Sequence, residues 1–233
     1  MERFFKLSQS STTVGVELGA GLTTFMAMAY IAFVNPQMMA SAGMDQGAAF
    51  VATCIAAALA CFFMGLYANW PVGLAPGMGL NAFFTYTIVG DMGYPWETAL
   101  GAVFIAGILF VILTVTRLRE WMLVSIPWNL RIAMGAGIGL FVGMIGLRNG
   151  GLIVDHPATL LSLGNFRITE TLLAALGFLI ITGLATRRFP GAILLGILAA
   201  TAVGLGVGVV QYQGVVSAPP SITPVLGKLD IAA

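Results

Sequence analysis

Residues 69–84 read NWPVGLAPGMGLNAFF, and the interpretation of the whole chain starts from this stretch. Two prolines and three glycines fall within nine of its residues: Pro71, Gly73, Pro76, Gly77 and Gly79. Pro76 disfavours helix at the residue before it, yet it suits the first turn of a helix that starts after it. The spacing therefore predicts a break in regular structure, followed by a helix that starts near Gly77.

The lengths of the two parts fit a membrane span. Five extended residues, 72–76, cover about 16 Å at about 3.3 Å each. Thirteen helical residues, 77–89, add about 20 Å at 1.5 Å each. Together they exceed the roughly 30 Å of the hydrocarbon core. We therefore expect a short strand joined to a half-helix.

The composition indicates a membrane protein. Of the 233 residues, 59% are hydrophobic and 8% are charged, whereas a soluble domain carries about 25% charged residues. The net charge of +1 provides no basic field for nucleic acid. With a single histidine and two cysteines, both interpreted as buried packing residues, the chain lacks the parts of a zinc or nucleophilic site. We expect no enzyme, no cofactor and no metal.

The uncharged gaps between charged clusters predict an all-α polytopic membrane protein with seven spans. The spans are 14–38, 48–68, 72–89, 97–116, 129–147, 168–186 and 190–210. Residues 1–13 then form the N-terminal segment, 14–210 the seven-segment repeat and 211–233 a tail too polar to span. A second set of seven following an odd count would enter from the opposite face as an inverted repeat.

Lys and Arg sort by side of the membrane. If the N-terminus is cytoplasmic, Arg148, Arg167 and Lys228 lie outside. Seven lie inside: Arg3, Lys6, Arg117, Arg119, Arg131, Arg187 and Arg188. This bias predicts a multi-pass protein of the plasma or inner membrane with its N-terminus in the cytoplasm.

The broken third span is the candidate ligand site. Non-helical backbone in hydrocarbon must be paired within protein or line a polar cavity. The amides at the helix start and the amide side chain of Asn81 then face the middle of the membrane, and the glycines allow close approach of a ligand. The alternative is a proline-kinked helix whose glycines serve only packing.

Residues 74–84, residues 21–31 and Asn35-Pro36 together resemble the xanthine/uracil/vitamin C permease family of nucleobase/cation symporters. The match is closest to its adenine/guanine/hypoxanthine branch. Residues 136–141 and 145–147 also resemble that branch, so the likeness covers nearly the whole chain.

The resemblance implies a transporter of two inverted sets of seven segments, with a purine nucleobase bound between segments three and ten. Carried onto this sequence, the base contacts are Ala75, Gly77, Met78, Gly79, Leu80 and Asn81, with Thr24, Phe25 and Tyr30 as weaker candidates. Proton coupling would use carboxylates of segments eight and ten, which lie beyond residue 233. We therefore expect the N-terminal half of a purine permease, unable to transport alone.

Two alternatives remain. One is a seven-span channel or scaffold that assembles in the lipid bilayer through small-residue faces on spans five and seven. The other is a homodimer of opposed copies, against which the Lys and Arg bias argues. Glu17 is interpreted as a snorkelling carboxylate at the helix entry, His156 as a solvated loop residue, and Asn35-Pro36 as a kink or helix end.

Overall fold

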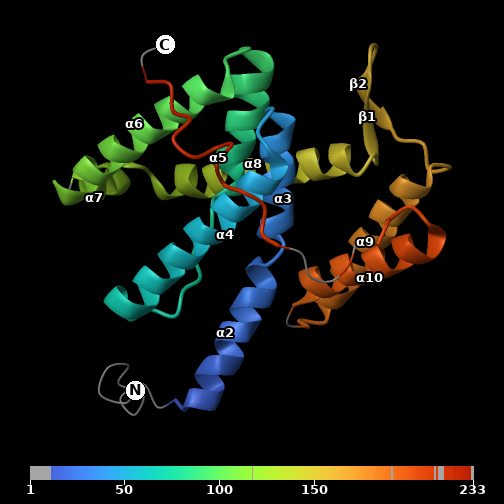
Figure 1. Ribbon diagram of the computed structural model, residues 1–233, viewed down its shortest axis with the longest axis horizontal. Helices are drawn as coiled ribbons and strands as arrows, with labels where there is room; N and C mark the ends of the chain where they lie inside the picture. Colours follow the sequence, from blue (N-terminus) through green and yellow to red (C-terminus); the bar gives the residue numbers. More distant parts are fainter. Residues whose placement is uncertain (1–11, 117, 190, 213, 215–217, 232–233) are drawn as a thin grey trace. The chain divides into compact units, whose positions relative to one another are not determined.

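The computed structural model describes residues 12–116, 118–189, 191–212, 214 and 218–231 (Figure 1). The described chain is mostly helical, with one two-stranded sheet. It divides into two compact units. The first unit comprises Met1–Val34, Ala52–Pro76 and Gly146–Pro219, and the second comprises Asn35–Val51, Gly77–Ile145 and Pro220–Ala233.

Within the described residues, five helical stretches are long and apolar enough to cross a membrane. The first joins α2 (Val14–Met28) and α3 (Ile31–Ser41), and the second joins α4 (Gln46–Phe63) to a π-helical turn, η1 (Met64–Ala68). The others are α6 (Trp96–Val115), α8 (Trp128–Asn149) and α9 (Thr169–Thr186). These five correspond to five of the seven predicted spans. A separate short helix, α7 (Leu118–Ser125), lies between α6 and α8.

The third and seventh predicted spans contain shorter helices. In the third, α5 (Met78–Ala82) continues into the π-helical η2 (Phe83–Asp91), and these 14 residues rise about 21 Å. In the seventh, α10 (Ala192–Val207) has 16 residues and rises about 24 Å. Left-handed glycines flank α10 at both ends, with φ of 77° at Gly191 and 79° at Gly208. A count of seven spans stays a prediction.

The all-α prediction is wrong in one place. Strands β1 (Ile153–His156) and β2 (Leu160–Leu163) pair antiparallel where an outer loop was expected, with Ile153 opposite Leu163. The turn between them is closed by a side chain, because Nδ1 of His156 accepts hydrogen bonds from the backbone N–H groups of Ala158 and Thr159 at 3.3 and 3.4 Å. His156 therefore shapes the hairpin turn.

Small residues organise the first unit. Helices α9 and α10 pack side by side (Figure 1), and Gly196 and Gly204 of α10 are buried. A Cβ on Gly204 would lie 2.9 Å from Cδ2 of Leu173, and one on Gly196 would collide with Ile181. The small face predicted on span seven thus packs against α9. By contrast, a Cβ added to Gly135, Gly139 or Gly143, the small face predicted on span five, would meet no other part of the described chain within 4 Å.

The core of the second unit gathers around the buried residues Ala42, Phe84 and Ala99. They come from the loop after α3, from η2 and from α6. The described part of the C-terminal tail has no helix, and Asp230 donates its backbone N–H to the Glu97 carbonyl at 3.2 Å. This core and the tail support the start of α6.

The prediction of a helix end at Asn35-Pro36 is wrong, whereas a kink there stays a prediction. Helix α3 runs through Pro36 to Ser41, and the break in the first span comes earlier, at the turn over Ala29 and Tyr30. A proline removes one helical hydrogen bond, and its ring crowds the carbonyl group four residues earlier. For Pro36 that carbonyl belongs to Ala32, in the first turn of α3. Interrupting the helix just upstream of that carbonyl accommodates Pro36, whose side chain is fully buried.

Candidate functional site

The break predicted at Pro76 is present. The non-helical segment, residues 69–77, begins after η1 at Asn69, which has a left-handed φ of 50°. It ends at Gly77, whose φ of −79° and ψ of 111° are extended, and α5 begins at Met78, one residue after the predicted start. The alternative of a continuous proline-kinked helix is therefore wrong. No strand forms over 72–76, because no described segment pairs with it as a ladder.

Two helices of the first unit hold the non-helical segment in place. From α4, the Cys61 sulfur accepts a hydrogen bond from the Leu74 N–H and donates one to the Leu74 carbonyl, each at 3.2 Å. From α2, Thr24 and Met28 lie against Gly73. A Cβ on Gly73 would come within 2.9 Å of Cγ2 of Thr24 and would collide with the Met28 sulfur. Glycine at position 73 is what allows the segment to lie this close to α2.

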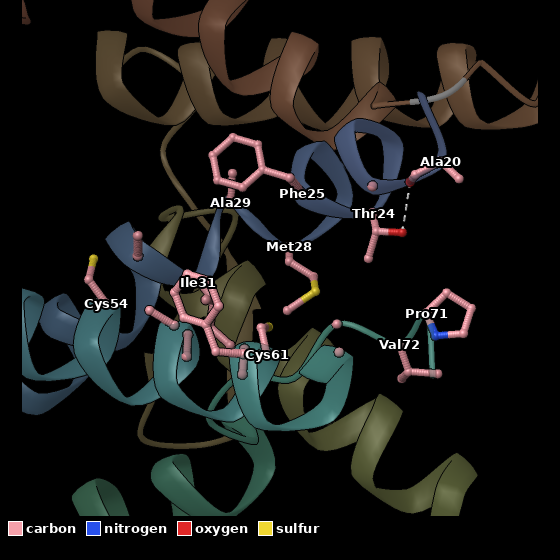
Figure 2. Close-up of a pocket in the computed structure, with 18 of the residues that line it drawn as sticks. Ala20, Thr24, Phe25, Met28, Ala29, Ile31, Cys54, Cys61, Pro71 and Val72 are labelled. Carbon is pink, nitrogen blue, oxygen red and sulfur yellow. Dashed lines mark hydrogen bonds between the residues drawn. The ribbon is translucent and has the colours of Figure 1, made fainter. Parts of the chain in front are cut away.

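A cavity of about 700 Å³ lies in the first unit, bounded by α2, α4 and the non-helical segment (Figure 2). Its volume falls in the range of sites for small organic ligands, and its lining is predominantly apolar. Helix α2 contributes residues at helical spacing, from Glu17 to Met28, α4 contributes a matching face from Thr53 to Phe62, and η1 contributes Gly65. Glu17, half-buried, is the one charged residue of the lining.

Three of the predicted site residues meet at this cavity: Thr24, Phe25 and Ala75. Figure 2 shows Thr24, whose hydroxyl donates to the Ala20 carbonyl within α2 at 3.0 Å, so that its lone pairs remain to accept from a ligand. Phe25 is 63% exposed. Tyr30 does not line the cavity and lies in the turn between α2 and α3.

The remaining predicted residues, Gly77 to Asn81, belong to the second unit. The first N–H groups of a helix have no partner within it, so the start of α5 presents donors. Gly79 packs against α8, where a Cβ would lie 2.9 Å from Cγ2 of Ile138, and Leu80 is 79% exposed. Glycine is thus needed at position 79 for packing against α8.

Asn81 has a partner that the sequence analysis did not assign. Its Nδ2 donates to Oδ1 of Asn35 on α3 at 2.6 Å, and Asn35 is only 5% exposed. This bond uses one of the two N–H donors of Asn81 and leaves its carbonyl oxygen and the second N–H for other contacts. Asn35, interpreted above through its proline neighbour, therefore positions a predicted ligand contact.

Cys61 and Glu17 are further residues that sequence reasoning placed elsewhere. Cys61 was interpreted as a packing residue, yet its thiol pairs with backbone. Glu17 was interpreted as snorkelling at the helix entry, yet it lies on the cavity face of α2, seven residues from Thr24. That spacing of two helical turns was the available signal. Among the described residues, no group of three His, Cys, Asp or Glu could hold a metal ion.

The fold and the broken segment fit a membrane transport protein, and comparison with known sequences identifies the class. Residues 15–230 match the model of the Permease family, the xanthine and uracil permeases, and the chain belongs to this family. It is therefore a multi-pass membrane protein of a transporter family, not an enzyme. The resemblance drawn from residues 21–31 and 74–84 is confirmed.

Individual relatives refine the comparison. The chain is 50% identical to the adenine permease AdeP of Escherichia coli (strain K12) over 232 residues, which cover all of this chain and 52% of the relative. It is 40% identical to the guanine/hypoxanthine permease PbuG of Bacillus subtilis (strain 168) over 238 residues, covering 98% of this chain and 54% of the relative. The chain thus spans about half the length of the curated relatives it matches.

Proposed function

We propose that the complete protein to which this chain belongs carries purine nucleobases across the cell membrane together with protons. The observation that carries the proposal is the helical break at residues 69–77, held beside a cavity of about 700 Å³. Relatives named as adenine and guanine/hypoxanthine permeases support the substrate class. The excess of Lys and Arg on one side supports a cytoplasmic N-terminus in the plasma or inner membrane.

The proposed contacts follow from the chemistry of a flat heterocycle, which has ring nitrogens that accept and N–H groups that donate. Within the first unit, the Thr24 hydroxyl accepts from the base, the Phe25 ring stacks on it and Ala75 offers backbone groups. In the second unit, the amides at Gly77 to Leu80 and the free amide groups of Asn81 are the candidates. Tyr30 remains a candidate at the turn, and each group is tested separately.

We also propose that residues 14–210 form the first of two inverted seven-segment repeats, with residues 1–13 before it and residues 211–233 leading to the second repeat. The half-length match to the relatives supports this division. A single repeat would leave half of the polar site facing lipid or water. The coupling carboxylates would then come from the second repeat.

Uptake of radiolabelled adenine, guanine and hypoxanthine tests the function. Cells that lack their own purine uptake would express either the complete protein or residues 1–233 alone. We expect saturable, protonophore-sensitive uptake from the complete protein and none from the shorter chain. Absence of purine uptake by the complete protein contradicts the function, and saturable pH-dependent uptake by residues 1–233 alone contradicts the division into half-sites.

A matched pair of variants tests the cavity. Thr23 and Thr24 each donate a hydroxyl to the carbonyl four residues earlier in α2, at 2.9 and 3.0 Å, but only Thr24 lines the cavity. Valine keeps the shape of threonine and removes the hydroxyl. We expect Thr24→Val to raise the purine KM about fivefold, the worth of one ordinary hydrogen bond, and Thr23→Val to leave it within about twofold. If the two variants change the purine KM equally, the cavity does not bind the substrate.

A further inference from the structure

One side chain satisfies both backbone groups of a residue in the middle of the non-helical segment. The Cys61 thiol of α4 accepts from the Leu74 N–H and donates to the Leu74 carbonyl, with both sulfur distances at 3.2 Å. Cys61 is half-buried and lines the cavity (Figure 2). The thiol thus takes the place that a neighbouring strand would have in a sheet.

This pairing contributes to stability because it occurs in a segment without regular secondary structure. Away from water, each unpaired peptide group costs several times what it costs at a surface, and residues 71–76 lie outside helix and sheet, so neither supplies their partners. A thiol is a weak donor and a weak acceptor, so the two bonds hold the Leu74 peptide without locking it. Its neighbours in the chain, Gly73 and Ala75, both line the cavity.

The opposite side of the segment is limited by packing. Gly73 lies against Thr24 and Met28 of α2, so closely that even a methyl group would meet Cγ2 of Thr24 at 2.9 Å. Movement of the segment toward α2 is therefore blocked, and movement away from α4 breaks the bonds to the thiol. Between these two limits the Cys61 sulfur sets the position of the cavity wall at residues 73–75.

We propose that Cys61 is a positioning residue of the ligand site, whose thiol holds the Leu74 peptide and thereby sets the affinity of the cavity for its substrate. The substrate named here, a purine nucleobase, rests on the proposed function. Cys54 provides a spectroscopic comparison for the Cys61 thiol, because it lies on the same face of α4, seven residues earlier. Among the described residues, its thiol makes no hydrogen bond to the non-helical segment.

Transport by the complete protein provides the first test. We expect Cys61→Ala to raise the purine KM about fivefold, the size expected for the loss of two weak hydrogen bonds, with the maximal rate per molecule in the membrane changed less than twofold. Cys61→Ser keeps a donor and an acceptor and should return the KM to within twofold of the parent. An unchanged KM in Cys61→Ala, or equal KM values in the alanine and serine variants, overturns the proposal.

Infrared spectroscopy provides a second test that needs no substrate. A thiol that donates a hydrogen bond absorbs at a lower S–H stretching frequency than a free thiol. In the complete protein, with any cysteine outside residues 1–233 replaced by alanine, the Cys54→Ala variant reports Cys61 alone and the Cys61→Ala variant reports Cys54 alone. We expect the lower frequency for Cys61. If the S–H bands of Cys61 and Cys54 coincide, the proposal is overturned, even if purine uptake is present. If the Cys61 band is lowered but the complete protein takes up no purine, the thiol contact is supported and the proposed substrate is wrong.

Discussion

Replacing Asn35 and Asn81 with alanine, singly and together, tests whether their hydrogen bond positions the start of α5. The two side chains are 46 residues apart in sequence, and Nδ2 of Asn81 lies 2.6 Å from Oδ1 of Asn35. Asn35 is 5% exposed, so its carbonyl oxygen cannot turn to water when Asn81 is shortened. Each single variant therefore removes one side of this hydrogen bond and leaves the amide of a buried Asn35 or of a half-buried Asn81 with one partner fewer, at about 1–3 kcal/mol of unfolding free energy.

The double variant isolates the bond itself. Side-chain hydrogen bonds measured by such cycles in membrane proteins average about 0.6 kcal/mol and reach about 1.7 kcal/mol. The short distance and the burial of Asn35 place this pair in the upper part of that range, so we expect a coupling energy of about 1 kcal/mol. The double variant should thus be more stable than the sum of the two single effects indicates.

The measurement is the unfolding free energy of the complete protein in bicelles, obtained by steric trapping or by titration with a denaturing detergent. Asn129→Ala is the control, since Asn129 is exposed on α8 and its loss should change stability by less than about 0.5 kcal/mol. Additivity of the two single variants within about 0.3 kcal/mol would show that the bond contributes nothing, and the reasoning would fail.

Two further predictions concern glycines. Gly196→Leu should destabilise the protein by about 1–3 kcal/mol, because the new side chain collides with α9. On the same helix α10, a Cβ on Gly206 would meet nothing within 4 Å, so Gly206→Leu should cause no measurable loss of stability in a thermal unfolding assay. Gly77→Ala should leave folding unchanged, since Gly77 has an ordinary φ of −79° and open space around its Cα. If a base approaches the backbone there, the same variant raises the purine KM; an unaffected KM would remove Gly77 from the site.

Local chemistry made the break predictable. Pro76 lacks an N–H and restricts Ala75 whatever surrounds them, and the helix starts at Met78 as this argument requires. The uncharged gaps located five helices long and apolar enough to span for a similar reason, since the cost of burying charge in lipid does not depend on which neighbours are present. Both features arise from rules that act within one segment.

Contacts between segments were not predictable in the same way. Nothing in the spacing of Cys61 and Leu74, 13 residues apart across the end of α4, shows that a thiol would face a peptide. The hydrogen bond between Asn81 and Asn35 was likewise not predictable, because the sequence indicated only the effect of Pro36 on the backbone at Asn35 and nothing about the Asn35 side chain. The hairpin at residues 153–163 depends on a turn closed by His156, a residue that sequence reasoning treated as solvated.

The helical break also has a consequence for biosynthesis. Insertion machinery sorts a nascent segment by its own hydrophobicity, and the helix from Met78 to Asp91 rises only about 21 Å and carries an asparagine near its start. Such a segment is a poor substrate for autonomous insertion. Helices α2 and α4 leave the ribosome first and already supply the thiol and the close-packed face that receive residues 73–75. Order of synthesis, as well as hydrophobicity, then determines whether this part of the chain enters the bilayer.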